Sequence, residues 1–306
     1  MKILVILASY NGGKYIKHQI DSILNQESVS LDIMVFDDSS KDNTIKVLSN
    51  YSLNSKVIVH EREIGSGSAA NNFFNAIKGI SDEVINKYNF VAFSDQDDIW
   101  LPNKLNEASK ILKKESSSLY FSNLILWDEK TDNESIINKS YPQKKYDYLF
   151  EGGSAGCTYV LTNNLCLDLK NLLVQRKFVH WQYFSHDWFV YFYARVNQYK
   201  VSIDNKAYIR YRIHSENVHG QLNKNSLSAI IERLKLVKEG WYFKHIKGFS
   251  EFTPKGSTAY NIYQLYYKNY FSRLYVLLKY NFKLMRSSKK FIQFFIISLI
   301  PLKINK

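Results

Sequence analysis

The sequence has no run of about 18 or more apolar residues, which is the length that a membrane-spanning helix needs. It also has only two cysteines, Cys157 and Cys166, among 306 residues. Two thiols cannot form a disulfide framework, although one bridge between them is possible, and so few cysteines favour a reducing compartment. The apolar run near the N-terminus, residues 3–8, is too short for an export signal, so we expect a buried strand there.

Negative charge is scarce in the last quarter of the chain. Residues 1–226 carry 26 Lys and Arg against 25 Asp and Glu, whereas residues 227–306 carry 15 against 3. The same tail holds 17 of the 47 aromatic residues. A basic aromatic face could also bind nucleic acid, but the near-neutral body and its acidic motifs argue against that partner.

The basic tail is expected to be helical and to attach to a membrane surface. Its apolar side chains recur at helical spacing, at Tyr260, Tyr263, Tyr267, Tyr270, Leu274 and Leu277. Residues 291–302 are apolar but number only 12, which suits an interfacial segment rather than a span. Anionic lipid headgroups attract clusters of Lys and Arg, so we expect contact with an anionic membrane. The alternative is a helical subdomain that packs on the body or on a second copy, as a homodimer.

The rest of the chain has the pattern of an α/β domain, which we place at residues 1–220, with a helical region at 221–306. Short apolar runs alternate with helical patterns, which predicts a mostly parallel sheet covered by helices on both faces. The expected strands are residues 3–7, 33–36, 57–61, 90–93, 119–127, 158–161 and 208–213. The expected helices are residues 15–24, 44–48, 69–80 and 187–196.

Polar residues follow three of the expected strands directly, in the segments 9–11, 37–38 and 95–98. Ligands bind at the carboxyl ends of strands in open parallel sheets, so these segments should converge on one site. Asp95 and Asp97 are two residues apart, and carboxylates in such a turn suit Mg²⁺ or Mn²⁺. The alternative for this pair is an exposed acidic turn without a ligand.

These three segments resemble the signature blocks of glycosyltransferase family 2. The blocks are residues 7–12 (Leu-Ala-Ser-Tyr-Asn-Gly), 36–44 (Phe-Asp-Asp-Ser-Ser-Lys-Asp-Asn-Thr) and 94–100 (Ser-Asp-Gln-Asp-Asp-Ile-Trp). The resemblance covers roughly residues 1–220, and it implies the GT-A fold, which is Rossmann-like, and an inverting transfer of a sugar from a nucleotide-diphosphate donor.

The resemblance also implies roles for single residues. Tyr10 would pack on the nucleobase beside the backbone of Ala8, and Asp38 would accept a hydrogen bond from a uracil or thymine ring. Asp95 would approach the ribose and the metal, and Asp97 would bind the metal directly. Without the family, Tyr10 would be read as a half-buried loop aromatic and Asp38 as a cap or turn residue.

An inverting transfer needs a base that takes the proton of the acceptor hydroxyl. The candidate is Asp187, within Ser-His-Asp-Trp at residues 185–188, which resembles a rhamnosyltransferase-like branch of the family. Aspartate also favours helix N-termini, so a capping role is the alternative. In residues 211–220, which resemble a block of the same branch, Arg212 would suit a diphosphate and His214 would complete the metal shell. The alternative for that block is a surface loop.

The function expected from this resemblance is transfer of L-rhamnose from dTDP-L-rhamnose to a lipid-linked or polysaccharide glycan, in the cytoplasm at the inner face of the cell membrane. The alternatives are a UDP-hexose-dependent glycosyltransferase, a sugar nucleotidyltransferase, and a silent membrane-associated scaffold. One segment departs from the family pattern. Glu63 replaces the usual Asn of the block at residues 63–72, and a basic residue is missing there.

Overall fold

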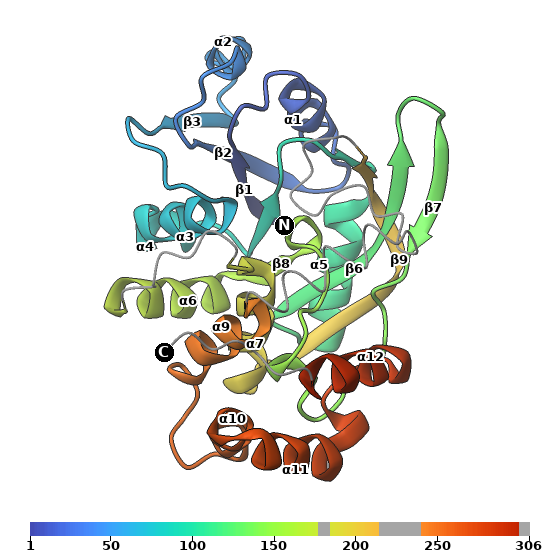
Figure 1. Ribbon diagram of the computed structural model, residues 1–306. Helices are drawn as coiled ribbons and strands as arrows, with labels where there is room; N and C mark the ends of the chain where they lie inside the picture. Colours follow the sequence, from blue (N-terminus) through green and yellow to red (C-terminus); the bar gives the residue numbers. More distant parts are fainter. Residues whose placement is uncertain (177–183, 214–239, 300–306) are drawn as a thin grey trace.

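The computed structural model describes residues 1–176, 184–213 and 240–299, which form a nine-stranded sheet with helices on both faces (Figure 1). The strands are β1 (Lys2–Ser9), β2 (Ser30–Asp37), β3 (Val57–Glu61), β4 (Phe90–Ser94), β5 (Ile99–Trp100), β6 (Leu119–Asp128), β7 (Asn133–Ile137), β8 (Val160–Thr162) and β9 (Val201–Arg212). Their order is β3-β2-β1-β4-β8-β6-β9-β5, and β7 pairs with β6.

The first four strands form the parallel half of the sheet. β1 pairs with both β2 and β4, and β2 pairs with β3. Ser9 lies opposite Asp37, and Leu7 lies opposite Ser94, so the carboxyl ends of β1, β2 and β4 are neighbours. The predicted strands are therefore confirmed here, and the polar segments that follow them do meet at one edge.

The other half of the sheet is mixed. β8 pairs antiparallel with β4 and β6, β6 pairs in parallel with β9, and β5 closes the far edge antiparallel to β9. The pattern did not identify β5, which has only two residues, or β7, which is largely exposed, because neither shows an apolar alternation. Residues 156–158 form a 3₁₀ turn (η2, Gly156–Thr158) before the short β8, so the strand predicted at residues 158–161 begins two residues later than expected.

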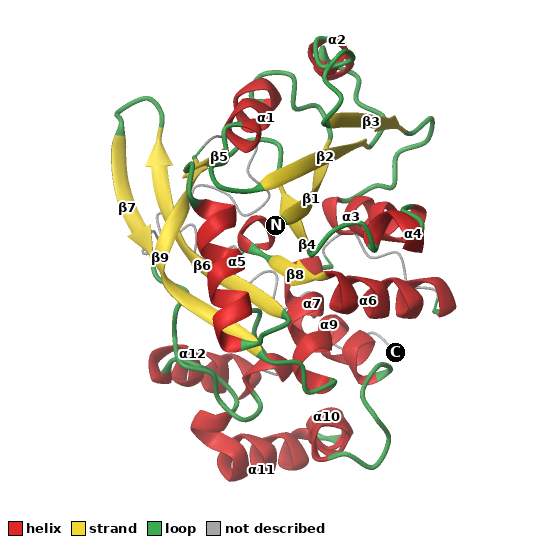
Figure 2. Cartoon of the chain, turned by 180° about the vertical axis from the view of Figure 1, so that it is seen from behind, coloured by secondary structure: helices red, strands yellow, loops and turns green. Residues whose placement is uncertain are grey.

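Helices cover both faces, as the sequence predicts (Figure 2). Alternate residues of β1 point to opposite cores: Ile3 packs with the helices at residues 16–24 and 104–115, whereas Leu4 packs with those at residues 69–79, 163–175 and 186–196. The helices of this part of the chain are α1 (Ile16–Leu24), α2 (Thr44–Ser49), α3 (Ala69–Gly79), α4 (Asp82–Ile85), α5 (Lys104–Glu115), α6 (Asn163–Gln175) and α7 (His186–Val196), and a 3₁₀ turn, η1, spans Asp147–Leu149.

The C-terminal helices pack on the body. They are α9 (Trp241–Ser250), α10 (Thr258–Lys268), α11 (Tyr270–Tyr280) and α12 (Ser288–Leu299), with a 3₁₀ turn, η3, at Asn281–Lys283. Their buried residues, such as Phe249 and Tyr263, belong to the same core as α3 and α7. The expected boundary near residue 221 lies outside the described residues. Among the residues that are described, no helix combines the length and the apolar character needed to cross a membrane.

Candidate active site

The turn after β2 is held by a buried aspartate. Asp37 is 1% exposed and accepts hydrogen bonds from Ser9 Oγ at 2.9 Å and from the backbone N–H of Ser40 at 2.8 Å. Asp42 accepts from the backbone N–H groups of Gly13 and Thr44, at 3.0 and 2.9 Å. These carboxylates join the loop after β1 to the loop after β2, so they are structural.

The loop that carries Tyr10 is joined to the acidic loop by one side chain, Gln96. Its amide accepts a hydrogen bond from Tyr10 N–H at 2.8 Å and donates one to the Tyr10 carbonyl at 2.9 Å. A Cβ atom on Gly12 would lie 2.2 Å from Gln96 Oε1, so a side chain there would displace the amide. Tyr10 is 55% exposed, and Ala8, at the end of β1, is 9% exposed and pairs with Phe36. The Tyr10 ring is thus available to a ligand while its backbone is fixed.

Asp38 lies beneath the loop that departs from the family pattern. It is 5% exposed, and its carboxylate accepts hydrogen bonds from the backbone N–H of Ser66 at 2.7 Å and from Ser66 Oγ at 2.9 Å. Arg62 Nε lies 3.9 Å from the same carboxylate. A Cβ atom on Gly65 would lie 2.9 Å from the Asp38 carbonyl, so only glycine permits this close approach. The loop after β3 therefore holds Asp38 in place.

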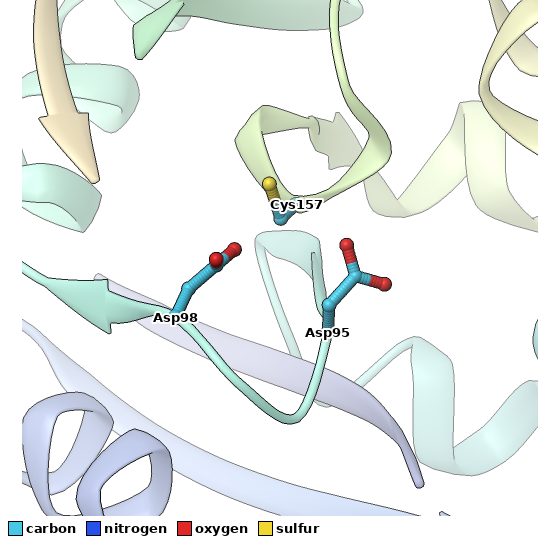
Figure 3. Close-up of side chains that lie close together, drawn as sticks. All are labelled: Asp95, Asp98 and Cys157. Carbon is cyan, nitrogen blue, oxygen red and sulfur yellow. The ribbon is translucent and has the colours of Figure 1, made fainter. Parts of the chain in front are cut away.

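A cluster of potential ligands lies where β4 ends. One side-chain atom each of Asp95, Asp98 and Cys157 lie within 4.8 Å of one another, with the thiol above the two carboxylates (Figure 3). Asp98 is 1% exposed, and its Oδ2 has no hydrogen-bond partner among the described residues apart from the thiol beside it. Burial, followed by the charges of Asp97 and Asp187, raises the pKa of Asp95 to about 7.

This cluster overlaps the predicted metal site only in part. Asp95 belongs to both sets, whereas Asp97 lies outside the cluster and His214 lies outside the described residues. Burial raises the pKa of the Cys157 thiol well above its ordinary value, and Asp98 and Asp95 raise it further, so the thiol stays protonated. Mutually repelling carboxylates, and a buried Asp98 oxygen beside a protonated thiol, fit a hard divalent cation, since such cations prefer oxygen ligands.

A buried lysine lies under the acidic loop. Lys104 is 1% exposed, and its Nζ lies 3.4 Å from the centroid of the Trp100 ring. Burial lowers the pKa of Lys104 to about 7, and the neighbouring Cys157 and Asp98 oppose that shift. The lysine therefore supplies partial positive charge below Asp98.

Asp187 faces the same cluster from the start of α7. Its Oδ1 accepts hydrogen bonds from the backbone N–H of Trp188 at 2.7 Å and from the hydroxyl of Ser185, which caps the helix. The negative charge of Asp187 contributes to the raised pKa of Asp95, which shows that the two carboxyls are electrostatic neighbours. The aspartate therefore stabilises the helix start and is also an electrostatic neighbour of the candidate site.

The start of α7 rests on a histidine from the C-terminal helices. The backbone N–H of Ser185 donates to His245 Nε2 at 3.0 Å, and the other ring nitrogen, Nδ1, lies 3.0 Å from the Trp241 carbonyl. The ring stacks on Trp188 at 5.0 Å, and burial lowers the pKa of His245 to about 3. His245 is therefore neutral, with Nδ1 donating and Nε2 accepting.

Arg212 lies beneath the acidic loop rather than at its surface. It is 1% exposed, its Nε donates to the Asp97 carbonyl at 2.9 Å, and it forms an ion pair with Glu129. Its guanidinium also lies 4.6 Å from the Tyr15 ring and 4.7 Å from the Trp127 ring. The observed contacts are those of a residue that positions the Asp97 backbone, and the contact of Arg212 with a diphosphate stays a prediction.

The structure thus places Tyr10, Asp38, Asp95, Asp97 and Asp187 around one edge of the sheet. The sequence analysis did not identify Gln96, Lys104, His245 or the arginine that follows η3, Arg286, as parts of this region. Gln96 lies inside the acidic motif, and that position was the only signal for it. Lys104 is near Asp98 and Trp100 in sequence, but nothing in the sequence marks it as buried. His245 and Arg286 contact the site through Ser185 and Gly152, which are distant in sequence, so no local pattern marks them.

Comparison with known proteins identifies similar chains. The model of the family described as Glycosyl transferase family 2 matches residues 4–160. The dTDP-rhamnosyl transferase RfbG of Shigella flexneri is 33% identical over 243 residues, which cover 78% of this chain and 82% of the relative.

Two further proteins extend the comparison. The UDP-Glc:alpha-D-GlcNAc-diphosphoundecaprenol beta-1,3-glucosyltransferase WfgD of Escherichia coli is 32% identical over 169 residues, covering 54% of this chain and 62% of the relative. The crystal structure of S. aureus TarS with UDP-GlcNAc is similar in fold, with a TM-score of 0.59 and 17% identity, over 98% of this chain and 82% of that chain.

Proposed function

Since this chain belongs to glycosyltransferase family 2 and has the GT-A fold, we propose that it transfers a sugar, with inversion, from a nucleotide-diphosphate donor to a hydroxyl of a glycan. The observation that carries this proposal is the convergence of the loops after β1, β2 and β4 with the start of α7. Together these segments bring the exposed Tyr10, the carboxylates of the acidic loop and the carboxylate of Asp187 to one region of the protein.

Asp187 is the proposed base. Its Oδ1 is occupied by Trp188 N–H and the Ser185 hydroxyl, which leaves Oδ2 to take the proton from the acceptor. The acceptor oxygen forms a bond to the anomeric carbon while the bond from that carbon to the diphosphate breaks on the opposite face. The bonds to Oδ1 hold the carboxylate in one orientation, which lowers the entropic cost of the transition state.

A Mn²⁺ or Mg²⁺ ion fits the acidic loop. Asp95 and Asp97 are the proposed ligands, Asp95 also approaches the ribose, and His214 stays the predicted third ligand. When bound, the ion supplies a Lewis acid that stabilises the departing diphosphate. Arg212 supports the loop by donating to the Asp97 carbonyl, and Lys104 is a buried basic group whose pKa burial lowers and the charge of Asp98 raises.

The proposed donor is dTDP-L-rhamnose, because a dTDP-rhamnosyl transferase is similar over most of both chains. Tyr10 would stack on the thymine beside Ala8, and Asp38 would accept a hydrogen bond from the ring N–H. Each carboxylate oxygen of Asp38 can accept two hydrogen bonds, so Ser66 leaves room for this one. A UDP-hexose is the second candidate, since WfgD is named for UDP-Glc.

The proposed acceptor is a lipid-linked or polysaccharide glycan in cell-surface polysaccharide synthesis. WfgD, named for an acceptor on diphosphoundecaprenol, supports a lipid-linked acceptor. We place the enzyme in the cytoplasm, attached to the inner face of the cell membrane, because its tail from residue 227 carries 15 Lys and Arg against 3 Glu.

The donor is tested with a panel of nucleotide sugars in the presence and absence of Mn²⁺ or Mg²⁺, scored by hydrolysis of the donor and by thermal stabilisation. We expect the largest response with dTDP-L-rhamnose and a divalent ion. The absence of a response to every donor would refute the proposed function. Formation of a nucleotide sugar from a nucleoside triphosphate and a sugar phosphate would indicate a nucleotidyltransferase instead.

The base is tested with Asp187→Asn, which retains the oxygen that accepts from Trp188 N–H and should therefore preserve the fold. General-base catalysis contributes about 10²- to 10⁴-fold, so we expect kcat to fall by that order while donor binding is kept. Glu83→Gln is the matched control, because Glu83 also lies in the first turn of a serine-capped helix, α4. Equal activity of the two variants would exclude Asp187 as the base, and donor binding without any transfer in the wild type would indicate a silent scaffold.

A further inference from the structure

The end of the chain carries charge of one sign only. Between residue 252 and the last residue there are 10 Lys and Arg and no Asp or Glu. Two of them, Arg273 and Arg286, are buried against the protein, at 7% and 4% exposure. Others, including Lys268, Lys279 and Lys283, are exposed on the outer helices. The exposed positive charge therefore lies on the surface of α10 and α11 and on the turn η3 that follows them.

The same helices expose an apolar stripe. Seven of the 14 large apolar residues that are exposed in the described chain lie between residues 270 and 296. On α11 the stripe consists of Phe271, Tyr275 and Leu278, whose spacing of three or four residues places them on one side of the helix, and the exposed Phe282 follows in η3. The Phe282 ring lies 4.9 Å from the Phe291 ring of α12. The stripe therefore continues from α11 to the next helix, which exposes two isoleucines.

A groove with basic walls adjoins the stripe. It lies between α10 and α11, has a volume of about 700 Å³, and includes Lys268, Lys279 and Tyr267 in its lining. Lys279 Nζ is bound to the hydroxyl of Tyr275 at 2.7 Å, so the groove and the stripe share an edge. Figure 1 shows α10, α11 and α12 together at the end of the molecule opposite α1 and α2.

We propose that α10, α11 and α12 form a face that docks on an anionic bilayer, with lipid phosphates in the groove at Lys268 and Lys279 and the stripe of α11 among the upper acyl chains. This inference rests on the membrane location proposed above and assigns it to particular residues. Apolar side chains flanked by lysines suit the boundary between headgroups and hydrocarbon. A second copy of the chain is a poorer occupant, because the two faces would bring like charges together.

The docking face connects to the candidate active site through Arg286, which lies between η3 and α12. Its guanidinium donates to the carbonyls of Gly152 and Gly153. A Cβ atom on Gly152 would lie 3.3 Å from Trp188, the neighbour of Asp187. Membrane attachment would therefore hold the proposed base at a set position relative to the lipid surface, where a lipid-linked acceptor lies.

The test is co-sedimentation of the full chain with vesicles of equal parts phosphatidylglycerol and phosphatidylcholine. The charge variant is Lys268→Gln with Lys279→Gln, and its control is Lys113→Gln with Lys114→Gln on α5. The apolar variant is Leu278→Gln, 60% exposed on α11, and its control is Val174→Gln, 63% exposed on α6. Point variants are preferred to a deletion of residues 285–306, because that deletion would remove Arg286.

We expect the charge variant to bind about thirtyfold more weakly, because each lysine near an anionic surface contributes about fivefold to binding and the variant removes two. Leu278→Gln should weaken binding on the order of tenfold. Both controls should bind like the wild type. Inorganic phosphate, at the same phosphorus concentration as the vesicles, should not bind measurably. Donor hydrolysis in solution should be unchanged in all four variants, which separates this inference from the proposed chemistry.

Three results would overturn the inference. Unchanged vesicle binding of both the charge variant and Leu278→Gln would place membrane attachment elsewhere in the chain. Absence of wild-type binding would reject the membrane location as well, while the hydrolysis assay would still report on the transferase. A wild-type dimer in analytical ultracentrifugation that Leu278→Gln converts to a monomer would identify the stripe as a contact between copies.

Discussion

Arg286 offers a sharp test of how the C-terminal helices support the candidate site. Its side chain is 1% exposed and donates to three backbone carbonyls, including those of Gly152 and Gly153. Its Nε lies 3.5 Å from Glu151 Oε1, which is itself buried. Arg286→Met would keep the approximate length of the side chain but would remove the charge and every donor.

The expected loss of stability follows from these contacts. Removing one partner of a buried ion pair costs about 3–5 kcal/mol when the remaining charge is left uncompensated, and because Lys290 still lies 3.1 Å from Glu151 Oε2, we expect the lower end of that range. The carbonyls that lose a donor add to this cost unless water reaches them. At about 2–4 °C per kcal/mol, a cost of about 3 kcal/mol should lower the melting temperature by roughly 6–12 °C. The Gly152 loop packs against Trp188, so we also expect kcat to fall more than donor affinity.

The assay is a double-mutant cycle of Arg286→Met and Glu151→Gln, read by thermal unfolding and by initial rates of transfer. Most of the destabilisation by Arg286→Met should disappear in the Glu151→Gln background, because no buried charge is then left alone. Arg210→Met with Glu134→Gln is the control, since that pair is 42% and 36% exposed and should be worth about 0–1 kcal/mol. Equal effects in the two cycles would refute the role assigned to Arg286.

Three further predictions concern the site itself. Gln96→Ala should raise the KM for the donor at least about tenfold, because it removes both hydrogen bonds to Tyr10, and a KM within twofold of the wild type would contradict this. His245→Phe should lower kcat without changing donor binding, since Ser185 N–H loses its acceptor, whereas His245→Gln, which can restore an acceptor, should recover part of the rate. Metal affinity, measured by calorimetry, should weaken about tenfold per pH unit below pH 7. The pKa of Asp95 is raised to about 7, so below that pH the cation must displace a proton from its carboxyl group. Equal metal affinity at pH 3.8 and at about pH 7 would refute the assignment of Asp95 as a ligand. In the metal-free protein the raised pKa of Asp95 favours the folded state at low pH, and this contribution to stability is lost as the pH rises from 3.8 through about 7.

The pattern of the sequence was sufficient for the parallel half of the fold. Continuous apolar runs such as residues 3–7 can be buried only as strands covered on both faces, and the helical patterns between them force parallel connections. Strands in that order bring their carboxyl ends together, so the convergence of Tyr10, Asp38 and Asp95 followed from local signals alone. The short edge strands were not predictable, because β5 has two residues and depends on pairing with β9.

The tail shows the limit of composition as evidence. Its charge and aromatic content were plain in the sequence, but burial divided it into two sets of residues. Tyr263 is fully buried beside α7, whereas Phe271 is 79% exposed, although both lie in helices of similar character. Arg286 counts as one more basic residue in the sequence and is an internal ion-pair partner in the fold. Periodicity marks the faces of a helix but does not say which neighbour covers each face.

The sequence by itself therefore determined the sheet core, the acidic loop and the sign of the tail, because each is written in residues close together along the chain. Only the tertiary structure decided what holds the site in place. Tyr10 and Gln96 are 86 residues apart, Ser185 and His245 are 60 apart, and Gly152 and Arg286 are 134 apart. Hydrogen bonds over such separations depend on how the sheet and the C-terminal helices pack, and no local pattern encodes that packing.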